Sequence, residues 1–355
     1  MTLLFFLVGL IFLIVGAELL VRGASQVASE FGISPLIIGL TVVAFGTSSP
    51  ELAVSIKSAL SGQADIALGN VIGSNIFNVL FILGISALII PLRVSSQLIK
   101  FDVPLMIALS ITVLLFAIDR TISSLDGWLL LSGLICYIGY LIYQGTKSGQ
   151  SVDESALSPS TGEGNRLVQI LFIVGGLLLL IVGSRWLVDG AVSFATYLGV
   201  SEIVIGLTVV AAGTSLPEVV TSIIAAVKGE RDIAVGNVVG SNIFNIVGVL
   251  GLAGIFSGSG IPVIEGAFYF DIPIMVAVAF ACLPIFFTGG TINRWEGLLL
   301  LGYYLAYTFY LVMAASRYES LAIFSNAMLY FVIPLTAITL LVVSIQEYRK
   351  RGSTV

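Results

Sequence analysis

GNVIGSNIFNVLFILG at residues 69–84 recurs as GNVVGSNIFNIVGVLG at residues 236–251, an offset of 167 (236 − 69). The same offset carries GTSSPE at 46–51 onto GTSLPE at 213–218. Two matched segments in one order and at one spacing indicate a duplication. The chain therefore consists of two halves built on the same plan.

Composition gives the class of protein. Of the 355 residues, 58% are hydrophobic and only 10% are charged. The apolar runs are long and unbroken, which is typical of transmembrane helices and not of barrel strands. Eleven such runs lie near 3–22, 35–60, 65–90, 102–118, 126–144, 168–188, 202–227, 232–256, 270–288, 295–315 and 321–346.

Five spans in each half have a topological consequence. An odd number places the two halves in opposite orientations in the membrane, which is the inverted repeat of many secondary transporters. We predict an all-α polytopic membrane protein with an extra C-terminal span. The expected parts are a first repeat at 1–144, a cytoplasmic linker at 145–167, a second repeat at 168–315, and the extra span with a basic tail at 316–355.

Basic residues predict the orientation. Of the 15 Lys and Arg residues, four fall on the N-terminal side of the predicted spans and eleven on the other side. Because cytoplasmic loops carry the excess of positive charge, we expect the N-terminus outside and the C-terminus in the cytoplasm.

Several classes of function are disfavoured. The chain has no histidine, which removes most zinc and transition-metal sites and all His-based catalytic triads. It contains no HExxH motif and no evident nucleophile–base pair, so we do not expect an enzyme. The net charge of −5 is thinly spread and indicates no nucleic-acid partner. No bound cofactor is expected.

Glu51 and Glu218 are the central candidates for function. Each lies in the middle of a long apolar run, where a carboxylate costs roughly 2.5–3.5 kcal/mol on insertion scales. Pro50 and Pro217 cannot donate a backbone hydrogen bond, so the helix should break within 46–50 and within 213–217.

A break at membrane depth is tolerated where the freed backbone lines a cavity or binds ions. The candidate donors are the carbonyls of Ala44, Thr47, Ala211 and Thr214, the hydroxyls of Thr47, Ser48, Thr214 and Ser215, and the side chains of Ser74, Asn78, Ser241 and Asn245. Every one of these donors is an oxygen, a set that suits Ca²⁺ and Na⁺.

Structural roles compete with these assignments. Either TxxPE break could be a kink whose Glu caps a helix or is held protonated. Gly236 and Gly240, with their counterparts in the first half, could serve close helix packing. Asn75 and Asn242 are better suited to holding helices together than to binding ions. A second copy of the break at a fixed offset favours the functional interpretation for the two Glu residues.

The paired motifs GTSSPE…GNVIGSNIFN and GTSLPE…GNVVGSNIFN resemble the two α-repeats of the calcium/cation antiporter superfamily, most closely those of prokaryotic sodium/calcium exchangers. The resemblance covers about residues 1–315. It implies a prokaryotic cell membrane, ten core spans in an inverted five-plus-five arrangement, and alternating access by sliding of the first and sixth spans.

The resemblance also implies a set of ligands. Its calcium site corresponds to Glu51 and Glu218 with the carbonyls of Thr47 and Thr214. Its sodium sites correspond to Ala44, Thr47, Ser48, Ser74 and Glu218, and to Ala211, Thr214, Ser215, Ser241 and Glu51, with Asn78 and Asn245 at the centre. Some relatives, including potassium-dependent ones, carry Asp where this chain has Asn245, which argues against potassium co-transport.

These residues lead us to expect Na⁺/Ca²⁺ antiport in the lipid bilayer. Two alternatives stay open. Protons can compete for buried carboxylates, so coupling of Ca²⁺ or another cation to protons is one. A cation channel that uses the same residues is the other, although tight sites slow the release of ions.

Overall fold

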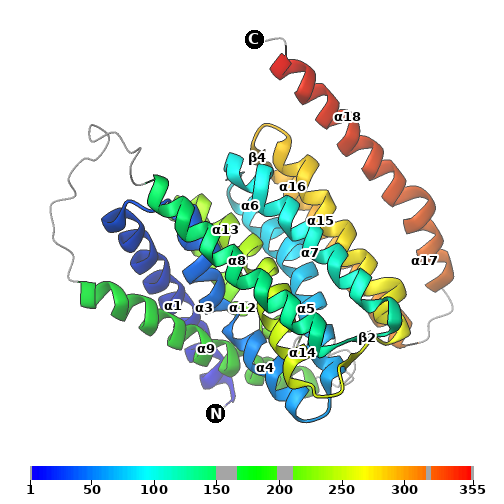
Figure 1. Ribbon diagram of the computed structural model, residues 1–355, viewed down its shortest axis with the longest axis horizontal. Helices are drawn as coiled ribbons and strands as arrows, with labels where there is room; N and C mark the ends of the chain where they lie inside the picture. The colour runs from blue at the N-terminus through cyan, green and yellow to red at the C-terminus, as the bar shows by residue number, and fades with distance from the viewer. Residues whose placement is uncertain (1, 149–165, 198–210, 317–320, 353–355) are drawn as a thin grey trace.

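The protein folds into a helical bundle in the computed structural model, which describes residues 2–148, 166–197, 211–316 and 321–352 (Figure 1). Within these residues, nine helices are long and apolar enough to cross a membrane, and a bent pair at Pro35–Leu60 makes a tenth candidate. The predicted span at 202–227 is described from residue 211 only, and most of the predicted linker falls outside the described ranges.

The first half contains the following elements: α1 (Thr2–Phe31), α2 (Pro35–Ile38), η1 (Gly39–Val43), α3 (Ala44–Thr47), α4 (Ser49–Leu60), α5 (Ala64–Phe77), η2 (Asn78–Leu83), α6 (Gly84–Ile89), β1 (Leu92–Arg93), η3 (Leu98–Asp102), α7 (Val103–Phe116), η4 (Ala117–Asp119), β2 (Thr121–Ile122) and α8 (Ser124–Ser148).

The second half contains these elements: α9 (Arg166–Tyr197), α11 (Ala211–Gly213), α12 (Leu216–Val227), α13 (Arg231–Phe244), η6 (Asn245–Leu250), α14 (Gly251–Phe256), β3 (Ile261–Pro262), η7 (Ala267–Asp271), α15 (Ile272–Phe287), β4 (Thr291–Ile292) and α16 (Arg294–Ala315). The chain then continues through α17 (Leu321–Ala327), η8 (Met328–Val332) and α18 (Ile333–Gly352).

The helices α1 and α9 open the two halves and lie side by side in opposite directions (Figure 1). A Cβ added at Gly9 would lie 2.8 Å from the carbonyl oxygen of Gly183, and one added at Gly176 would lie 2.6 Å from that of Gly16. The glycines therefore allow the two backbones to touch. Because equivalent helices of the halves run antiparallel, the halves are inverted relative to each other.

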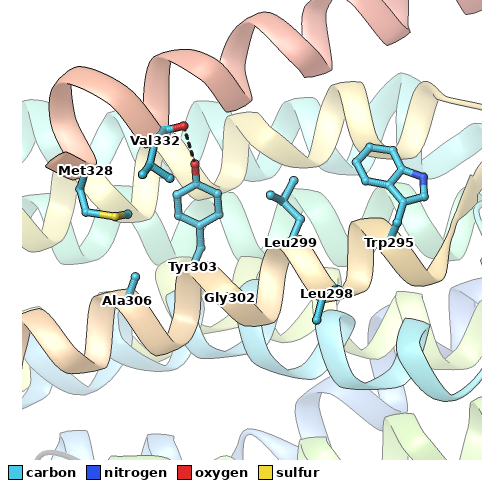
Figure 2. Close-up of a pocket in the computed structure, with 8 residues that line it drawn as sticks. All are labelled: Trp295, Leu298, Leu299, Gly302, Tyr303, Ala306, Met328 and Val332. Atoms are coloured by element: carbon cyan, nitrogen blue, oxygen red, sulfur yellow. Dashed lines mark hydrogen bonds between the residues drawn. The ribbon is translucent and has the colours of Figure 1, made fainter.

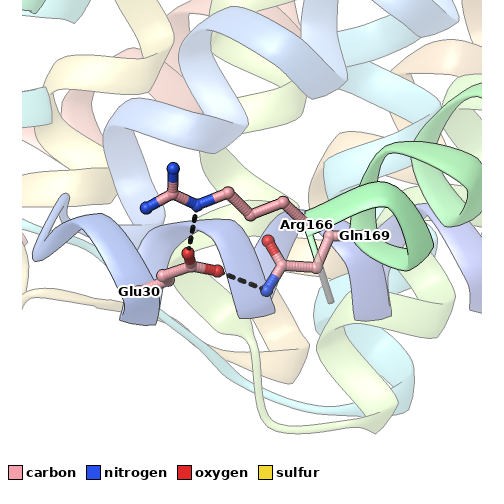
Figure 3. A network of polar contacts seen from close by, with 3 residues as sticks. All are labelled: Glu30, Arg166 and Gln169. Atoms are coloured by element: carbon pink, nitrogen blue, oxygen red, sulfur yellow. Dashed lines mark hydrogen bonds and ion pairs between the residues drawn. The ribbon is translucent and has the colours of Figure 1, made fainter. Parts of the chain in front are cut away.

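Polar contacts fix the register at one end of this helix pair. Arg166 Nε at the start of α9 donates to Glu30 Oε1 near the end of α1 at 2.8 Å, and Gln169 Nε2 donates to Glu30 Oε2 at 2.6 Å (Figure 3). A second ion pair joins Glu18 of α1 to Lys228, directly after α12, at 2.9 Å.

Short strands repeat the inversion at both ends of the bundle. The strand β1 pairs antiparallel with β4, and β2 pairs antiparallel with β3. The pairs join Leu92 to Ile292 and Ile122 to Ile261, so each strand of one half pairs with a strand of the other. Helix packing follows the same rule, since α8 lies on α14 and α16 lies on α6.

The interior of the bundle is formed by α5 with η2 and by α13 with η6. Every residue of α13 from Ile233 to Phe244 is buried, and Gly236 and Gly240 pack against the backbone of Leu36 and Leu40. The packing role considered for these two glycines is thus confirmed. It is wrong for their counterparts Gly69 and Gly73, where an added Cβ would meet nothing within 4 Å. These two central helices carry the second motif of each repeat into the core.

The extra C-terminal helix lies at the edge of the bundle, outside the two repeats (Figure 1). Tyr303 of α16 donates to Thr336 Oγ1 at 2.7 Å and to the Val332 carbonyl at 3.3 Å. An apolar cavity of about 420 Å³ lies between α16 and η8 (Figure 2). Its lining includes Trp295, Leu299 and Met328.

Candidate cation site

Both predicted helix breaks are present. The helix α3 ends at Thr47, Ser48 leaves helical geometry (φ −80°, ψ 7°), and α4 begins at Ser49 with a bend of 46° between the two parts. In the second half α11 ends at Gly213 and α12 begins at Leu216, with Ser215 at φ −90° and ψ 8°. Proline occupies the first turn of each new helix, where its missing N–H costs nothing.

The breaks place both carboxylates at helix N-termini. Glu51 lies in the first turn of α4 and Glu218 in the first turn of α12, and both are 0% exposed. The positive end of a helix dipole favours a negative charge at this position. Each half therefore brings one buried carboxylate to the interior on a helix that starts there.

The two halves exchange hydrogen bonds at the carboxylates. Ser48 Oγ donates to Glu218 Oε1 at 2.9 Å, and Ser215 Oγ donates to Glu51 Oε1 at 2.8 Å. The Ser215 hydroxyl also lies 3.2 Å from Ser74 Oγ. Each carboxylate is thus held by the broken helix of the opposite half, and neither half forms the cluster alone.

Asn78 and Asn245 lie at equivalent positions in the central helices. Each is the first residue of a π-helical segment, η2 and η6 respectively, and each is 0% exposed. Single π-turns inside α-helices are frequent at functional sites because the extra residue redirects a side chain. Neither π-helical turn was predicted from the sequence.

Buried oxygen atoms without a hydrogen-bond partner mark the cluster. Buried polar atoms are normally paired, so such atoms call for an explanation. Six of the predicted ligand residues have one: Glu51 Oε2, Glu218 Oε2, Asn78 Oδ1, Asn245 Oδ1, Thr214 Oγ1 and Ser241 Oγ. An all-oxygen set with two carboxylates fits hard cations such as Ca²⁺ and Na⁺. Among the described residues, no three or more His, Cys, Asp or Glu side chains are grouped closely enough to hold a metal ion between them.

The remaining predicted donors lie in the helices that end at the two breaks, α3 and α11. The Ala44 carbonyl accepts from the Ser48 N–H at 3.0 Å, so it is not freed by the break, although a carbonyl has a second lone pair. The Thr47 hydroxyl donates to Asn237 Oδ1 at 3.0 Å. Ala211 is the first described residue after 198–210, and nothing is shown of its side chain.

Two asparagines that the sequence analysis missed support the breaks. Asn70 Nδ2 donates to the Glu51 carbonyl at 3.2 Å and to Ser55 Oγ at 3.0 Å. Asn237 accepts from Thr47 and donates to Ser222 Oγ at 3.0 Å. Each is the second residue of its GNV motif, and the two positions differ by the common offset of 167. This duplication of a polar residue was the sequence signal by which they could have been predicted.

Comparison with known proteins decides the family. The model of the family described as "Sodium/calcium exchanger protein" matches residues 1–143 and 168–313. The chain belongs to the sodium/calcium exchanger family. The members of this family are transporters, so this exchanger is a cation antiporter of the membrane, and the family resemblance drawn from the paired motifs is confirmed.

Individual relatives agree with this assignment. The exchanger is 34% identical over 336 residues to the sodium/calcium exchanger MaX1 of Methanosarcina acetivorans, which covers 85% of this chain and 95% of the relative. It is 39% identical over 281 residues to the inner membrane protein YrbG of Escherichia coli, covering 78% and 86% of the two chains. Each match covers more than three quarters of this chain, so the similarity cannot be confined to one repeat or one motif.

A solved structure confirms the fold. The sodium-calcium exchanger NCX_Mj, soaked with 2.5 mM Na⁺ and 0.1 mM Ca²⁺, superposes with a TM-score of 0.74 at 32% identity. The match covers 89% of this exchanger and 98% of NCX_Mj. The predicted all-helical membrane architecture is therefore correct.

Proposed function

We propose that this exchanger moves Ca²⁺ against Na⁺ through one site that the two halves share. The observation that carries the proposal is the cluster of unpartnered, buried oxygens around Glu51 and Glu218. The carboxylates come from opposite halves and are cross-bonded by Ser48 and Ser215. The names of MaX1 and NCX_Mj, both sodium/calcium exchangers, support the same pair of ions.

Charge favours this pair of ions. Two carboxylates carry −2, which one Ca²⁺ neutralises and which two or three Na⁺ match with a similar net charge. We assign Ca²⁺ to Glu51 and Glu218 with the carbonyls of Thr47 and Thr214. We assign Na⁺ to the flanking oxygens, namely those of Ala44, Thr47, Ser48, Ser74 and Glu218 on one side and of Ala211, Thr214, Ser215, Ser241 and Glu51 on the other, with Asn78 and Asn245 between them.

Burial supplies a reason for obligatory exchange. Glu51 and Glu218 are fully enclosed, and two uncompensated carboxylates at membrane depth are costly. An unloaded site therefore resists the change between outward and inward access, whereas a site loaded with either ion has its charge compensated. Alternating access then couples the two ions without any direct contact between them.

The orientation and the division into parts belong to the same proposal. We place the N-terminus outside and the C-terminus in the cytoplasm, as the distribution of Lys and Arg indicates. The repeats at 1–144 and 168–315 would then share the transport site, and the segment at 316–355 would lie outside it.

Transport into vesicles tests this function. The purified protein is reconstituted into liposomes, and uptake of radiolabelled Ca²⁺ is measured with an outward Na⁺ gradient, with an outward H⁺ gradient, and with neither. We expect uptake only with the Na⁺ gradient. Uptake driven by protons would establish the proton-coupled alternative. Uptake that ignores both gradients would indicate a channel and would refute antiport.

A further inference from the structure

The amide of Asn75 is oriented by a backbone group of the other half. Asn75 Nδ2 donates to the Asn242 carbonyl at 3.2 Å, and Asn242 Nδ2 donates to the Asn75 carbonyl at 3.2 Å. A backbone carbonyl can only accept, so the nitrogen of each side-chain amide must face it. The usual ambiguity between the oxygen and nitrogen of an amide is therefore resolved by chemistry at both residues.

This orientation passes to the two central ligand candidates. With its nitrogen fixed, Asn75 turns its Oδ1 toward Asn245, whose Nδ2 donates to it at 3.1 Å. Asn242 Oδ1 accepts from Asn78 Nδ2 at 3.0 Å in the same way. The two chains of hydrogen bonds are related by the inversion of the repeat. One runs from the Asn242 carbonyl through the Asn75 amide to the Asn245 amide. The other runs from the Asn75 carbonyl through the Asn242 amide to the Asn78 amide.

The end of each chain of bonds is a free oxygen. Because their nitrogens are committed to the neighbouring asparagines, Asn78 and Asn245 are left with buried Oδ1 atoms that have no partner. The opposite rotamer of either amide would turn two N–H donors, which a cation repels, toward the same place.

We propose that Asn75 and Asn242 are positioning residues that make Asn245 and Asn78 present oxygen to the transported cation. The inference rests on the proposed function, in which Asn78 and Asn245 are ligands. It adds a task to the helix-holding role expected from sequence. Neither Asn75 nor Asn242 needs to touch the ion.

A double-mutant cycle separates orientation from packing. In Asn75→Leu the anchor is lost, so the Asn245 amide is free to turn. In Asn245→Asp both terminal atoms are oxygens, so no anchor is needed, and the Asn75 oxygen then faces another acceptor. Asn75→Leu should thus weaken cation binding in the native background and be neutral or favourable in the Asn245→Asp background.

The measurement is the midpoint of Ca²⁺- and Na⁺-induced thermal stabilisation of the purified protein in detergent. We expect Asn75→Leu to raise the cation concentration at the midpoint by about tenfold in the native background, the scale of one lost intramolecular hydrogen bond. In the Asn245→Asp background the change should stay within about twofold. Met275→Leu is the matched control, because it removes only the weak sulfur acceptor that Asn75 Nδ2 reaches at 3.8 Å and leaves the bond to the Asn242 carbonyl in place, and it should bind as the native protein does.

Equal loss in both backgrounds would mean that Asn75 only packs the helices, and an unchanged midpoint in the native background would also overturn the inference. If Asn75→Leu does not fold, Asn242→Leu with and without Asn78→Asp runs the same test through the other half. Absent Ca²⁺ flux with intact cation binding contradicts the proposed antiport alone. A native protein that neither cation stabilises contradicts both.

Discussion

Glu51 and Glu218 are the two carboxylates of the candidate site, and no basic side chain pairs with either among the described residues. Their compensation comes from serine hydroxyls and from two helix N-termini. Such neutral donors stabilise a carboxylate without filling its place for a cation. One oxygen of each carboxylate therefore stays free for a cation.

Removing either charge should stop transport. Glu51→Gln and Glu218→Gln keep the size of the side chain and remove one of two charges, so we expect Na⁺-dependent Ca²⁺ uptake to fall to the level of empty liposomes. Size-exclusion profiles should match the native protein, since neutralising a buried charge does not cost stability. Uptake that survives either change would show that the two carboxylates do not form a single site.

The serines beside the breaks allow a matched comparison. Ser48→Ala removes a hydrogen bond to the Glu218 carboxylate, a loss of about 1.5–3 kcal/mol, and should raise the Na⁺ concentration needed for half-maximal exchange. Ser49→Ala removes only a bond to the Phe45 carbonyl at 3.0 Å and should leave it unchanged. If both changes raise the Na⁺ concentration for half-maximal exchange equally, Ser48 acts by shaping the helix break and not by its hydrogen bond to Glu218.

At the scale of elements, α1 and α9 form a pair of helices whose backbones touch at glycines. This contact is long and antiparallel, and backbone meets backbone at the glycines while Phe12 of α1 stacks on Trp186 of α9 beside them. The ion pair at Glu30 holds the pair in one register, and the ion pair at Glu18 joins α1 to the end of α12. The pair adjoins α12, which carries Glu218.

Adjacent glycines of α9 give a test of this contact. A Cβ at Gly176 would lie 2.6 Å from the Gly16 carbonyl oxygen, whereas a Cβ at Gly175 meets nothing within 4 Å. We expect Gly176→Ala to lower the melting temperature, because overpacking costs about 1–3 kcal/mol. Gly175→Ala should be neutral or slightly stabilising, since alanine is the better helix former. Similar melting temperatures for the two variants would contradict the close approach of the backbones.

At the scale of the whole molecule, the candidate cation site lies within the two repeats and the last helix lies outside them. The described side chains of Leu321–Glu347 are largely exposed to the surroundings of the bundle, which in the membrane are lipid. Contact with the core runs through α15 and α16. The central helices α5 and α13 do not depend on it for burial.

Truncation after residue 316 should therefore preserve exchange. We expect Na⁺-dependent Ca²⁺ uptake by the truncated protein, with a lower melting temperature because the face of α16 loses its cover. Tyr303→Phe removes only the bonds to Val332 and Thr336 and should change stability less than truncation does. Loss of uptake by a truncated protein that still elutes as a single species would show that the last helix takes part in transport.

The sequence by itself determined the class, the inversion and the chemistry of this exchanger. Hydropathy reports spans because a membrane demands apolar side chains, and five spans in each half require inversion. The duplicated PE motifs located both helix breaks, since proline removes a backbone donor wherever it stands. Six buried oxygens without a hydrogen-bond partner belong to residues that the two duplicated motifs predicted as ligands.

Only the tertiary structure decided which groups meet. Ser48 bonds to Glu218 across 170 residues, and Asn75 meets the backbone of Asn242 across 167. Such pairings depend on how two inverted halves interlock, and periodicity within one helix carries no information about that. The π-turns at Asn78 and Asn245 are also a product of packing, because an extra residue per turn is stabilised by neighbours and not by local propensity.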